Sequence, residues 1–414
     1  MIEIAIMGHG TVGSGVTEIL TTHKQKLFAA IGEEIYIKYI LDLREFPDSP
    51  LSDRFTKNFD DIKNDKDIRV VVEVMGGLHP AYEFVKECLS QGKSVVTSNK
   101  ELVASFGAEL LQCAKDNNAN FLFEASVGGG IPIIRPISQC LIANNVSEIA
   151  GILNGTTNFI LTKMIDEGMQ FDDALKLAQD LGYAERNPEA DVEGYDACRK
   201  ICILASLAFS KHIYPDNVRC EGITKIALDD VKYAEIWGGV IKLIGRVKKL
   251  ENGLVDILVA PMFIKNSSML SSIDDVFNGI MVRGDCTGDV VFYGKGAGKL
   301  PTASAVVADI IDCIKHLKSR KYLFWADGDN SNVLDFNKSL TKMYIRCSAE
   351  NPTKAKELID SVFANSEYLV NEEADKNEIA FITPEYTYEE IENKKQKLQN
   401  ENIEIKSSIR IGDL

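Results

Sequence analysis

The chain begins Met-Ile-Glu-Ile-Ala-Ile-Met-Gly-His-Gly-Thr-Val-Gly, an apolar run over residues 2–7 that leads directly into the pattern G-x-G-x-x-G. Glycines permit a tight turn and let the backbone approach a pyrophosphate closely, while the helix that follows offers unpaired N–H groups and the positive end of its dipole. The pattern is a weak signal by itself. Placed between a strand and a helix, it predicts that a dinucleotide is bound by Gly8, Gly10, Thr11, Val12 and Gly13.

The rest of the first third of the chain also alternates between strand and helix patterns. β-branched runs at residues 35–41, 70–75, 95–97 and 121–124 alternate with helical patterns at 12–20, 81–91 and 108–117. Each connection between strands is long enough for a right-handed crossover. We therefore expect an α/β fold in which residues 1–130 form a Rossmann-type, doubly wound parallel sheet that binds NAD or NADP.

The ends of the predicted strands supply further cofactor contacts. Asp42 follows the second strand, where an acid would bind the ribose hydroxyls, although its distance from the glycines exceeds the usual spacing. The apolar Leu41 favours NAD over NADP, and Arg44 lies near enough to leave NADP open. Because strand carboxyl ends face the ligand crevice, we also expect contacts from Gly76, Thr97, Ser98 and Lys100.

Composition narrows the class of function. The 414 residues suggest two or three domains, and 46 Lys and Arg against 61 Asp and Glu give a net charge of −15. Such an acidic surface disfavours nucleic acids and anionic membranes and favours a small-molecule substrate. Nine scattered cysteines without a C-x-x-C pair indicate reduced thiols, and the N-terminal apolar run is too short for a signal sequence. We expect a cytoplasmic protein.

Beyond residue 130 the pattern changes. Residues 131–326 read as an α+β domain for substrate binding, catalysis and dimerisation, and its helix near 303–317 is expected to pack back on the nucleotide-binding domain. Hydrophobicity drops over residues 327–338, which is typical of a linker. Residues 340–414 then follow the order βαββαβ of a ferredoxin-like unit.

Two lysines are candidates for proton transfer beside a nicotinamide. Lys100 follows the fourth predicted strand and would face the substrate crevice. Asp196 and Lys200 are four residues apart, so a helix places them on one face. Such pairs usually lie at the surface, but the apolar residues 201–207 indicate a partly buried helix, where a lysine would have a lowered pKa and could exchange protons near neutrality.

An acidic stretch and a polar loop indicate an amino-acid substrate. Glu185 and Asp191 belong to five carboxylates within residues 185–196, a pattern that more often marks a solvated face. Glu185 could nevertheless hold a substrate ammonium group. The loop containing Asn154, Gly155 and Thr156 offers N–H and hydroxyl donors for a carboxylate.

These motifs resemble homoserine dehydrogenase along essentially the whole chain. The resemblance implies reversible, NAD(P)-dependent reduction of aspartate 4-semialdehyde to homoserine in threonine and methionine biosynthesis. It implies that Lys200 donates or accepts the proton, that Lys100 assists at the substrate oxygen, and that Asp196 supports the site. It also implies that Glu185 holds the substrate amino group. The resembling stretches are residues 8–15, 96–100, 124–132, 153–158, 181–185, 191–200, 293–298 and 301–305.

The resemblance carries further expectations. It places Gly182 and Gly298 beside the cofactor, and it implies a monovalent cation, usually sodium, bound by main-chain oxygens of Glu124, Val127, Gly129 and Ile131. It implies a homodimer or homotetramer and the monofunctional form, without a preceding kinase segment. The C-terminal unit resembles an ACT regulatory domain, but its first turn, Ala-Glu-Asn-Pro at residues 349–352, departs from the usual Asp-Arg-Pro-Gly pattern and puts threonine feedback in doubt.

The same residues are compatible with two other classes of function. The chain could be a nucleotide-responsive regulatory protein that has lost its chemistry, although retention of both Lys100 and Lys200 disfavours that reading. It could also be another NAD(P)-dependent amino-acid dehydrogenase or semialdehyde reductase. A cysteine nucleophile with a matching histidine has no evident candidate.

Overall fold

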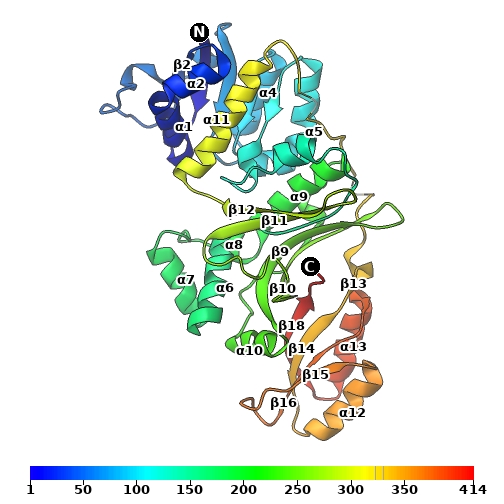
Figure 1. Ribbon diagram of the computed structural model, residues 1–414. Helices are drawn as coiled ribbons and strands as arrows, with labels where there is room; N and C mark the ends of the chain where they lie inside the picture. Colours follow the sequence, from blue (N-terminus) through cyan, green and yellow to red (C-terminus); the bar gives the residue numbers. More distant parts are fainter. Residues whose placement is uncertain (322, 330) are drawn as a thin grey trace. The chain divides into compact units, whose positions relative to one another are not determined.

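The computed structural model describes residues 1–321, 323–329 and 331–414, and the chain divides into two compact units (Figure 1). Unit 1 comprises residues 1–145, 202–216 and 294–330, and unit 2 comprises residues 146–201, 217–293 and 331–414. These boundaries differ from the three consecutive segments expected from the sequence. Two later segments return to the N-terminal unit, and the C-terminal segment joins the middle of the chain.

Unit 1 contains a six-stranded parallel sheet in the order β3-β2-β1-β4-β5-β6, the doubly wound arrangement expected from the sequence. Strands β2 and β4 lie on opposite sides of β1, so the strand order reverses at β1. Ligands of such sheets bind at this switch point, outside the strand carboxyl ends. The strands are β1 (Ile2–Met7), β2 (Ile35–Leu41), β3 (Phe55–Thr56), β4 (Ile68–Glu73), β5 (Ser94–Thr97) and β6 (Phe121–Leu122).

Helices cover this sheet, and one of them arrives from far along the chain. Helix α11 (Lys299–Lys315) packs against α1 so closely that a Cβ on Gly15 would lie 2.9 Å from the Cβ of Ala303. Ala303, Val306 and Ile310 are buried in the same core as the strands. No described helix is long and apolar enough to cross a membrane. The other helices of this part are α1 (Thr11–Thr22), α2 (Lys24–Ile31), α3 (Asp60–Lys63), α4 (Ala81–Ser90) and α5 (Lys100–Asp116).

A buried histidine ties the segment 202–216 into unit 1. The Trp325 indole N–H donates to His212 Nδ1 at 2.9 Å, and His212 Nε2 lies 2.9 Å from the carbonyl oxygen of Ala104. The ring therefore accepts at Nδ1 and donates at Nε2, which is the neutral form. Burial lowers the pKa of His212 below its ordinary value. A second proton would place two N–H donors face to face.

We expect this histidine to make the fold sensitive to acid. Below about pH 6.5 the imidazole of His212 is protonated in the unfolded chain but stays neutral in the folded chain. The free energy of unfolding therefore falls by up to about 1.4 kcal/mol for each pH unit of acidification. His212→Gln lacks this contribution. The stability advantage of the wild type over the variant, measured by urea unfolding, should therefore shrink as the pH falls. An advantage that stays constant with pH would contradict the assignment.

Unit 2 is built on a mixed sheet of ten strands, in the order β12-β11-β7-β9-β10-β18-β14-β16-β15, with β8 beside β10. In the sequence, strand-like apolar runs at residues 255–264 and 290–293 predict β10 and β12, whereas no pattern predicts β7, β9 or β11. The strands of its first part are β7 (Val146–Ile152), β8 (Arg219–Cys220), β9 (Gly239–Lys249), β10 (Val255–Lys265), β11 (Phe277–Gly284) and β12 (Gly288–Lys295). The helices are α6 (Gly155–Glu167), α7 (Phe171–Asp180), α8 (Glu189–Val192), α9 (Tyr195–Phe209, of which residues 195–201 belong to this unit) and α10 (Leu228–Ile236).

The C-terminal segment has its elements in the expected order βαββαβ, and neighbouring strands within it are antiparallel. Its last strand also pairs in parallel with β10, through Met262 and Phe263. The two sheets are therefore one. The elements are β14 (Met343–Ser348), α12 (Pro352–Val362), β15 (Glu367–Leu369), β16 (Glu378–Ile382), α13 (Tyr388–Asn400) and β18 (Glu404–Ile411), with β13 (Leu340–Thr341) and β17 (Tyr386–Thr387) forming a separate pair.

The expected linker at residues 327–338 is not a free connection. The Val255 N–H donates to the carbonyl oxygen of Asn332 at 2.8 Å, and the Leu334 N–H donates back to Val255 at the same distance. The Tyr214 hydroxyl donates to Asp327 at 2.6 Å. The described residues of this segment are partly or fully exposed, which accounts for their low hydrophobicity, and backbone hydrogen bonds hold them in place. Asn330 lies outside the described residues.

Candidate active site

The glycine turn after β1 has the geometry that its sequence predicts. Gly8 has φ +102°, and a Cβ there would lie 2.9 Å from the carbonyl oxygen of Val74. A Cβ on Gly13 would lie 2.1 Å from the carbonyl oxygen of Gly8. Gly10, the N-cap of α1, has no protein atom within 4 Å of its Cβ position. Gly8 and Gly13 are thus required by the protein backbone, while Gly10 leaves space where a phosphate would approach the helix N-terminus.

A cavity of about 460 Å³ opens at the carboxyl ends of β1, β2 and β4. Gly8, Gly10 and Asp42 line it, as the sequence predicts for a nucleotide. Lys57 and two aromatic residues also line it, and sequence reasoning missed all three. Lys57 and one of the aromatic residues directly follow the short strand β3, which would have been their signal, whereas the other aromatic residue lies on α4. The two aromatic residues are Phe59 and Phe84, which stack with ring centroids 3.9 Å apart.

Asp42 is saturated with hydrogen-bond donors. One oxygen accepts from the His9 backbone N–H at 2.8 Å and from Arg44 Nη2 at 2.8 Å. The other accepts from the backbone N–H and Nε of Arg44, both at 3.0 Å. The Arg44 guanidinium holds the pKa of Asp42 well below its usual range, so the carboxylate is ionised at neutral pH. Arg44 itself is mostly exposed, with 62% of its side chain accessible.

The ends of β4 and β5 are joined by a buried acid that sequence reasoning missed. Glu73 accepts from the Thr97 hydroxyl at 2.5 Å and from the backbone N–H groups of Met75 and Gly76 at 2.8 and 3.4 Å. Burial raises the pKa of Glu73. An acid ending the apolar run Ile-Arg-Val-Val-Val-Glu was its signal. Glu73 thereby fixes Thr97, one of the predicted cofactor contacts.

Lys100 stands at the beginning of α5, directly after this strand end. The preceding Asn99 is the N-cap, whose side chain accepts from the Leu102 N–H at 3.0 Å and donates to the Gly77 carbonyl at 2.6 Å. The Ser98 N–H donates to the Glu73 carbonyl at 3.3 Å. Ser98 and Lys100 are therefore held at the carboxyl edge of the sheet, the position that the sequence predicts for them.

In unit 2 the predicted pair on α9 is buried and closely bonded. The Lys200 ammonium lies 2.6 Å from Asp196 Oδ2 and donates to the carbonyl oxygen of Leu153 at 2.7 Å. Lys200 is 8% exposed and Asp196 is 3% exposed. A surface pair is thereby excluded. Leu153 was missed because a carbonyl ligand leaves no mark in the side-chain pattern.

Asn154 joins a second acid to this pair, and the four side chains form one network. Its side-chain amide donates to Asp191 Oδ1 at 2.7 Å and to Asp196 Oδ2 at 2.8 Å. Its side-chain oxygen caps α6 by accepting from the Thr157 N–H at 2.9 Å. The structure therefore unites Asn154, Asp191, Asp196 and Lys200, which lie up to 46 residues apart in the sequence. The side-chain amide and oxygen of Asn154 are thus both occupied by partners within the protein.

The other predicted substrate and cofactor residues of unit 2 lie on neighbouring loops. Gly155 begins α6 with its Cβ position 2.7 Å from the Val276 carbonyl, and the Thr156 hydroxyl donates to the Tyr183 carbonyl at 2.7 Å. Gly182 has φ +76° in the turn after α7. Glu185 is exposed, and no described contact within unit 2 joins its carboxylate to Lys200. In unit 1, Gly298 caps α11 with φ +131°.

The turn expected to bind a cation is buried and tightly wound. Val127 and Ile131 are 0% and 2% exposed, and Gly128 and Gly129 have φ +74° and +53°. The Glu124 carboxylate is occupied, since it accepts from the backbone N–H groups of residues 133, 134 and 135 at 2.6 to 2.9 Å. Any cation here would have to use main-chain oxygens, which suit a hard ion.

Comparison with known proteins gives a consistent result. A family model described as "Homoserine dehydrogenase, NAD binding domain" matches residues 8–124, and one described as "Homoserine dehydrogenase" matches residues 132–311. The homoserine dehydrogenase of Bacillus subtilis is 40% identical over 320 residues, which cover 77% of this chain and 74% of the relative.

Solved structures agree with this result. A homoserine dehydrogenase from Thiobacillus denitrificans is 32% identical and superposes with a TM-score of 0.88, covering 100% of this chain and 98% of the other. A hyperthermophilic archaeal homoserine dehydrogenase in complex with NADPH is 28% identical, with a TM-score of 0.64 over 75% of this chain and 97% of the other.

Proposed function

Because the chain belongs to the homoserine dehydrogenase family of NAD(P)-dependent oxidoreductases, we propose that Lys200 exchanges the proton when L-homoserine and L-aspartate 4-semialdehyde are interconverted. The observation that carries this proposal is the buried ammonium of Lys200, held by Asp196 and the Leu153 carbonyl. A charge buried in this way costs free energy, which a catalytic role explains. The inactive regulatory reading is not favoured.

The proton step follows from this arrangement. The nicotinamide, when bound, supplies or accepts the hydride at the substrate carbon. In the direction of reduction, Lys200 gives its proton to the carbonyl oxygen, and in the direction of oxidation the amine takes it from the hydroxyl. Asp196 stabilises the protonated form and fixes its position. Lys100 is proposed to assist at the same oxygen.

Substrate binding is assigned to the loops around this network. We assign the substrate ammonium group to Glu185 and Asp191, and its carboxylate to the loop at Gly155 and Thr156. The Asn154 side chain is already bonded to two carboxylates. Its part is therefore to position Asp191 and Asp196. The reaction would serve threonine and methionine biosynthesis.

The cofactor site supports a preference for NAD. Gly8, Gly10 and Gly13 would hold the pyrophosphate, and Asp42 lies where ribose hydroxyls would bind, so a 2′-phosphate would meet a carboxylate that is already ionised. Arg44 and Lys57 line the same cavity and offer a phosphate some compensation. Binding of NADP would require the exposed Arg44 to turn from Asp42 toward the phosphate.

We therefore expect Arg44→Ala to sharpen the preference for NAD. The change frees Asp42 to accept from the ribose hydroxyls and removes a cation that would pair with the 2′-phosphate. The ratio of kcat/KM for NAD to that for NADP should rise about tenfold or more, as steady-state homoserine oxidation measures it. Lys26→Ala, which removes an exposed cation elsewhere in unit 1, should leave the ratio unchanged. A ratio that falls in Arg44→Ala would overturn the assignment.

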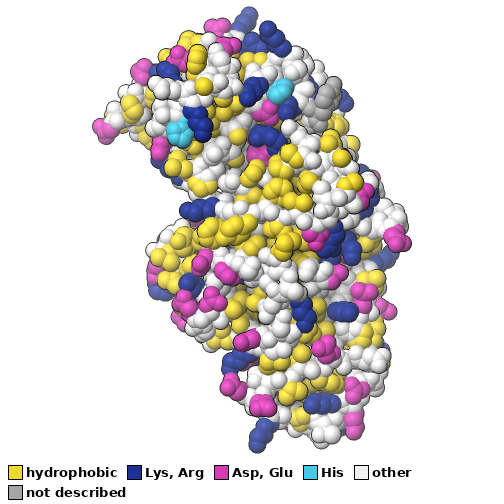
Figure 2. Space-filling view, in the orientation of Figure 1, with side chains coloured by type: hydrophobic (Ala, Val, Ile, Leu, Met, Phe, Trp, Pro, Cys, Tyr) yellow, Lys and Arg dark blue, Asp and Glu magenta, His cyan; other side chains and the backbone are white. Residues whose placement is uncertain are grey.

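A cation and an assembly complete the proposal. The buried turn at Glu124, Val127, Gly129 and Ile131 would hold a monovalent cation through main-chain oxygens, and sodium is the proposed ion. Assembly into a homodimer or homotetramer is supported by β12, whose apolar residues 290–293 are all partly or fully exposed. Hydrophobic side chains gather at the surface over β11 and β12 (Figure 2). An exposed apolar edge strand is a typical subunit contact.

The function is tested by steady-state assay of homoserine oxidation with NAD and with NADP. Turnover that depends on homoserine supports the proposal. Tight nucleotide binding without any turnover of homoserine would instead revive the regulatory reading.

A further inference from the structure

Strand β10 changes its partner along one edge, and this change opens a fork in the sheet of unit 2. Its residues Leu258 and Val259 pair with β8, whereas Met262 and Phe263 pair with β18. Pro261 lies between the two pairings and has no N–H to contribute to a ladder. Before residue 410, β18 leaves β10 and pairs only with β14. The two strands β8 and β18 therefore diverge.

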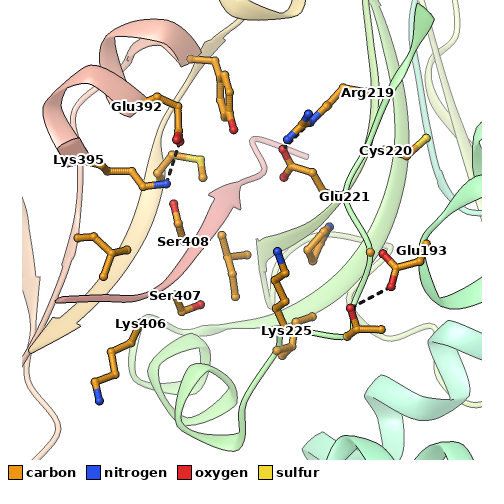
Figure 3. Close-up of a pocket in the computed structure, with 18 residues that line it drawn as sticks. Glu193, Arg219, Cys220, Glu221, Lys225, Glu392, Lys395, Lys406, Ser407 and Ser408 are labelled. Carbon is orange, nitrogen blue, oxygen red and sulfur yellow. Dashed lines mark hydrogen bonds and ion pairs between the residues drawn. The ribbon is translucent and has the colours of Figure 1, made fainter. Parts of the chain in front are cut away.

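A cavity of about 430 Å³ lies in this fork, and we call it the fork cavity (Figure 3). Three parts of unit 2 line it: β8 with the loop that follows, residues 219–226; the diverging part of β18, residues 405–409; and the side chains of α13 at Tyr388, Glu392 and Lys395. It is separate from the Lys200 network. It is also separate from the turn at residues 349–352, none of which line it.

One cation in the fork cavity has no ionic partner among the residues that the structure describes. Of the four lysines and arginines that line it, Arg219 pairs with Glu221 at 3.6 Å, Lys395 with Glu392 at 2.8 Å, and Lys406 with Glu404 at 3.5 Å. The fourth, Lys225, forms no ion pair or hydrogen bond with any described residue. Its ammonium points into the cavity (Figure 3).

A buried donor from β18 also lacks a partner. The Ser408 hydroxyl is inaccessible and has no hydrogen-bond partner among the described residues. The backbone N–H and carbonyl groups of Ser408 also face the cavity. Because the Ile411 N–H donates to Lys342 beside β14, alternation along the strand directs the backbone groups of residues 410 and 408 away from β14. On that side, residue 410 pairs with β10, whereas residue 408 lines the cavity.

These groups define the charge of an occupant. An ammonium and a hydroxyl without partners suit an anion, since charge-assisted hydrogen bonds are the strongest available to them. Three carboxylates, from Glu193, Glu221 and Glu392, also line the cavity and would repel a dianion. A single negative charge matches the single unpaired ammonium. Met343, Ile226 and Pro261 provide apolar surface for a short carbon chain.

One wall of the fork cavity is bonded to the segment that carries the catalytic network. The Ile223 N–H donates to the Val192 carbonyl at 2.9 Å, and the Thr224 hydroxyl donates to Glu193 at 3.0 Å. Residues 192 and 193 directly follow Asp191, which Asn154 connects to Asp196. A shift of residues 222–226 would therefore be transmitted to the acid that holds Lys200.

We propose that the fork cavity binds a small monocarboxylate through Lys225 and Ser408, and that its occupation changes the activity at Lys200. The coupling rests on the proposed function, whereas the binding does not. The C-terminal segment supplies Ser408 and the helix α13, so the occupant would join that segment to the loop at residues 222–226.

Binding is tested by calorimetric titration of the full chain without nucleotide or substrate, with L-lactate, propionate, succinate and inorganic phosphate as probes. We expect a monocarboxylate probe to bind with one site per chain. Lys225→Gln should weaken that binding about tenfold or more, and Ser408→Ala should weaken it severalfold. Lys249→Gln removes an exposed lysine of the same unit, outside the cavity, and should have no effect. Failure of both monocarboxylates to bind, stronger binding of phosphate or succinate, or unchanged binding in Lys225→Gln would overturn the proposal.

Coupling is tested with the monocarboxylate that binds. It should change kcat for homoserine oxidation in the wild type and leave it unchanged in Lys225→Gln. Equal kcat with and without the bound probe would overturn the coupling. If the wild type binds the probe but never oxidises homoserine, the proposed function fails while the binding site stands.

Discussion

Lys200→Ala is expected to lower kcat for homoserine oxidation by about 10²- to 10⁴-fold, the range that a positioned proton donor contributes. The variant loses the only group of the Asp196 pair that can give a proton to the substrate oxygen. Nucleotide affinity should be unchanged, because the residues assigned to the nucleotide, Gly8, Gly10 and Asp42, lie in unit 1 and make no contact with Lys200 in any described hydrogen bond or ion pair. Stopped-flow or steady-state assay measures the first quantity, and fluorescence titration with NADH measures the second.

The variant also leaves Asp196 without its cation in a buried place, which costs stability. Lys200→Met keeps most of the side-chain volume and should lose the same activity. Lys176→Ala is the matched control, because Lys176 pairs with Asp180 at 3.3 Å with the same spacing of four residues but at the surface of α7. Its kcat should equal that of the wild type. Turnover that survives in folded Lys200→Met would remove Lys200 from the mechanism.

The second large expected effect is a difference in stability between alanine substitutions at two glycines of the same turn, Gly13 and Gly10. Gly13→Ala should destabilise unit 1 by about 1–3 kcal/mol or more, because the new Cβ would lie 2.1 Å from the Gly8 carbonyl oxygen and the turn would have to open. Gly10→Ala should leave stability within about 0.5–1 kcal/mol of the wild type, because its Cβ meets no protein atom within 4 Å and its φ of −79° suits alanine.

Nucleotide binding should show the opposite contrast. The Cβ of Gly10→Ala would occupy the space beside the N-terminus of α1, so we expect NADH affinity to fall about tenfold or more in a chain that remains folded. Thermal unfolding and fluorescence titration of the two variants provide the comparison. Wild-type NADH affinity in Gly10→Ala would show that the pyrophosphate lies elsewhere.

The sequence predicted the nucleotide-binding sheet well because its signals are local. The order of β-branched runs and glycines around Gly8 and Gly13 describes a strand, a turn and a helix that are neighbours along the chain. The Asp196 and Lys200 pair was found for the same reason, since a helix places residues four apart on one face. In unit 2 the strands β7, β9 and β11 were missed. Their periodicity is weak, because β9 is buried on both faces along most of its length.

Several site residues could not be read from the sequence for a different reason. Glu73 and the Leu153 carbonyl owe their roles to groups that reach them from other strands or loops. The role proposed for Lys225 depends on the cavity that it lines between β8 and β18. Asn154 was expected to bind a substrate carboxylate, but the structure commits its amide to Asp191 and Asp196. A local pattern can show that a polar residue has a function, but its partners are decided by the packing.

By itself the sequence determined the class of sheet, the phosphate turn and the family, because these depend on residue order within short segments and on several ordered motifs. Only the tertiary structure decided that residues 202–216 and 294–330 join the N-terminal unit and that β18 extends the sheet of β10. The cavity between β8 and β18 also exists only because of the tertiary structure, in which these two strands diverge. Strand pairing and burial join residues hundreds of positions apart, and their free energy is not encoded in any one segment.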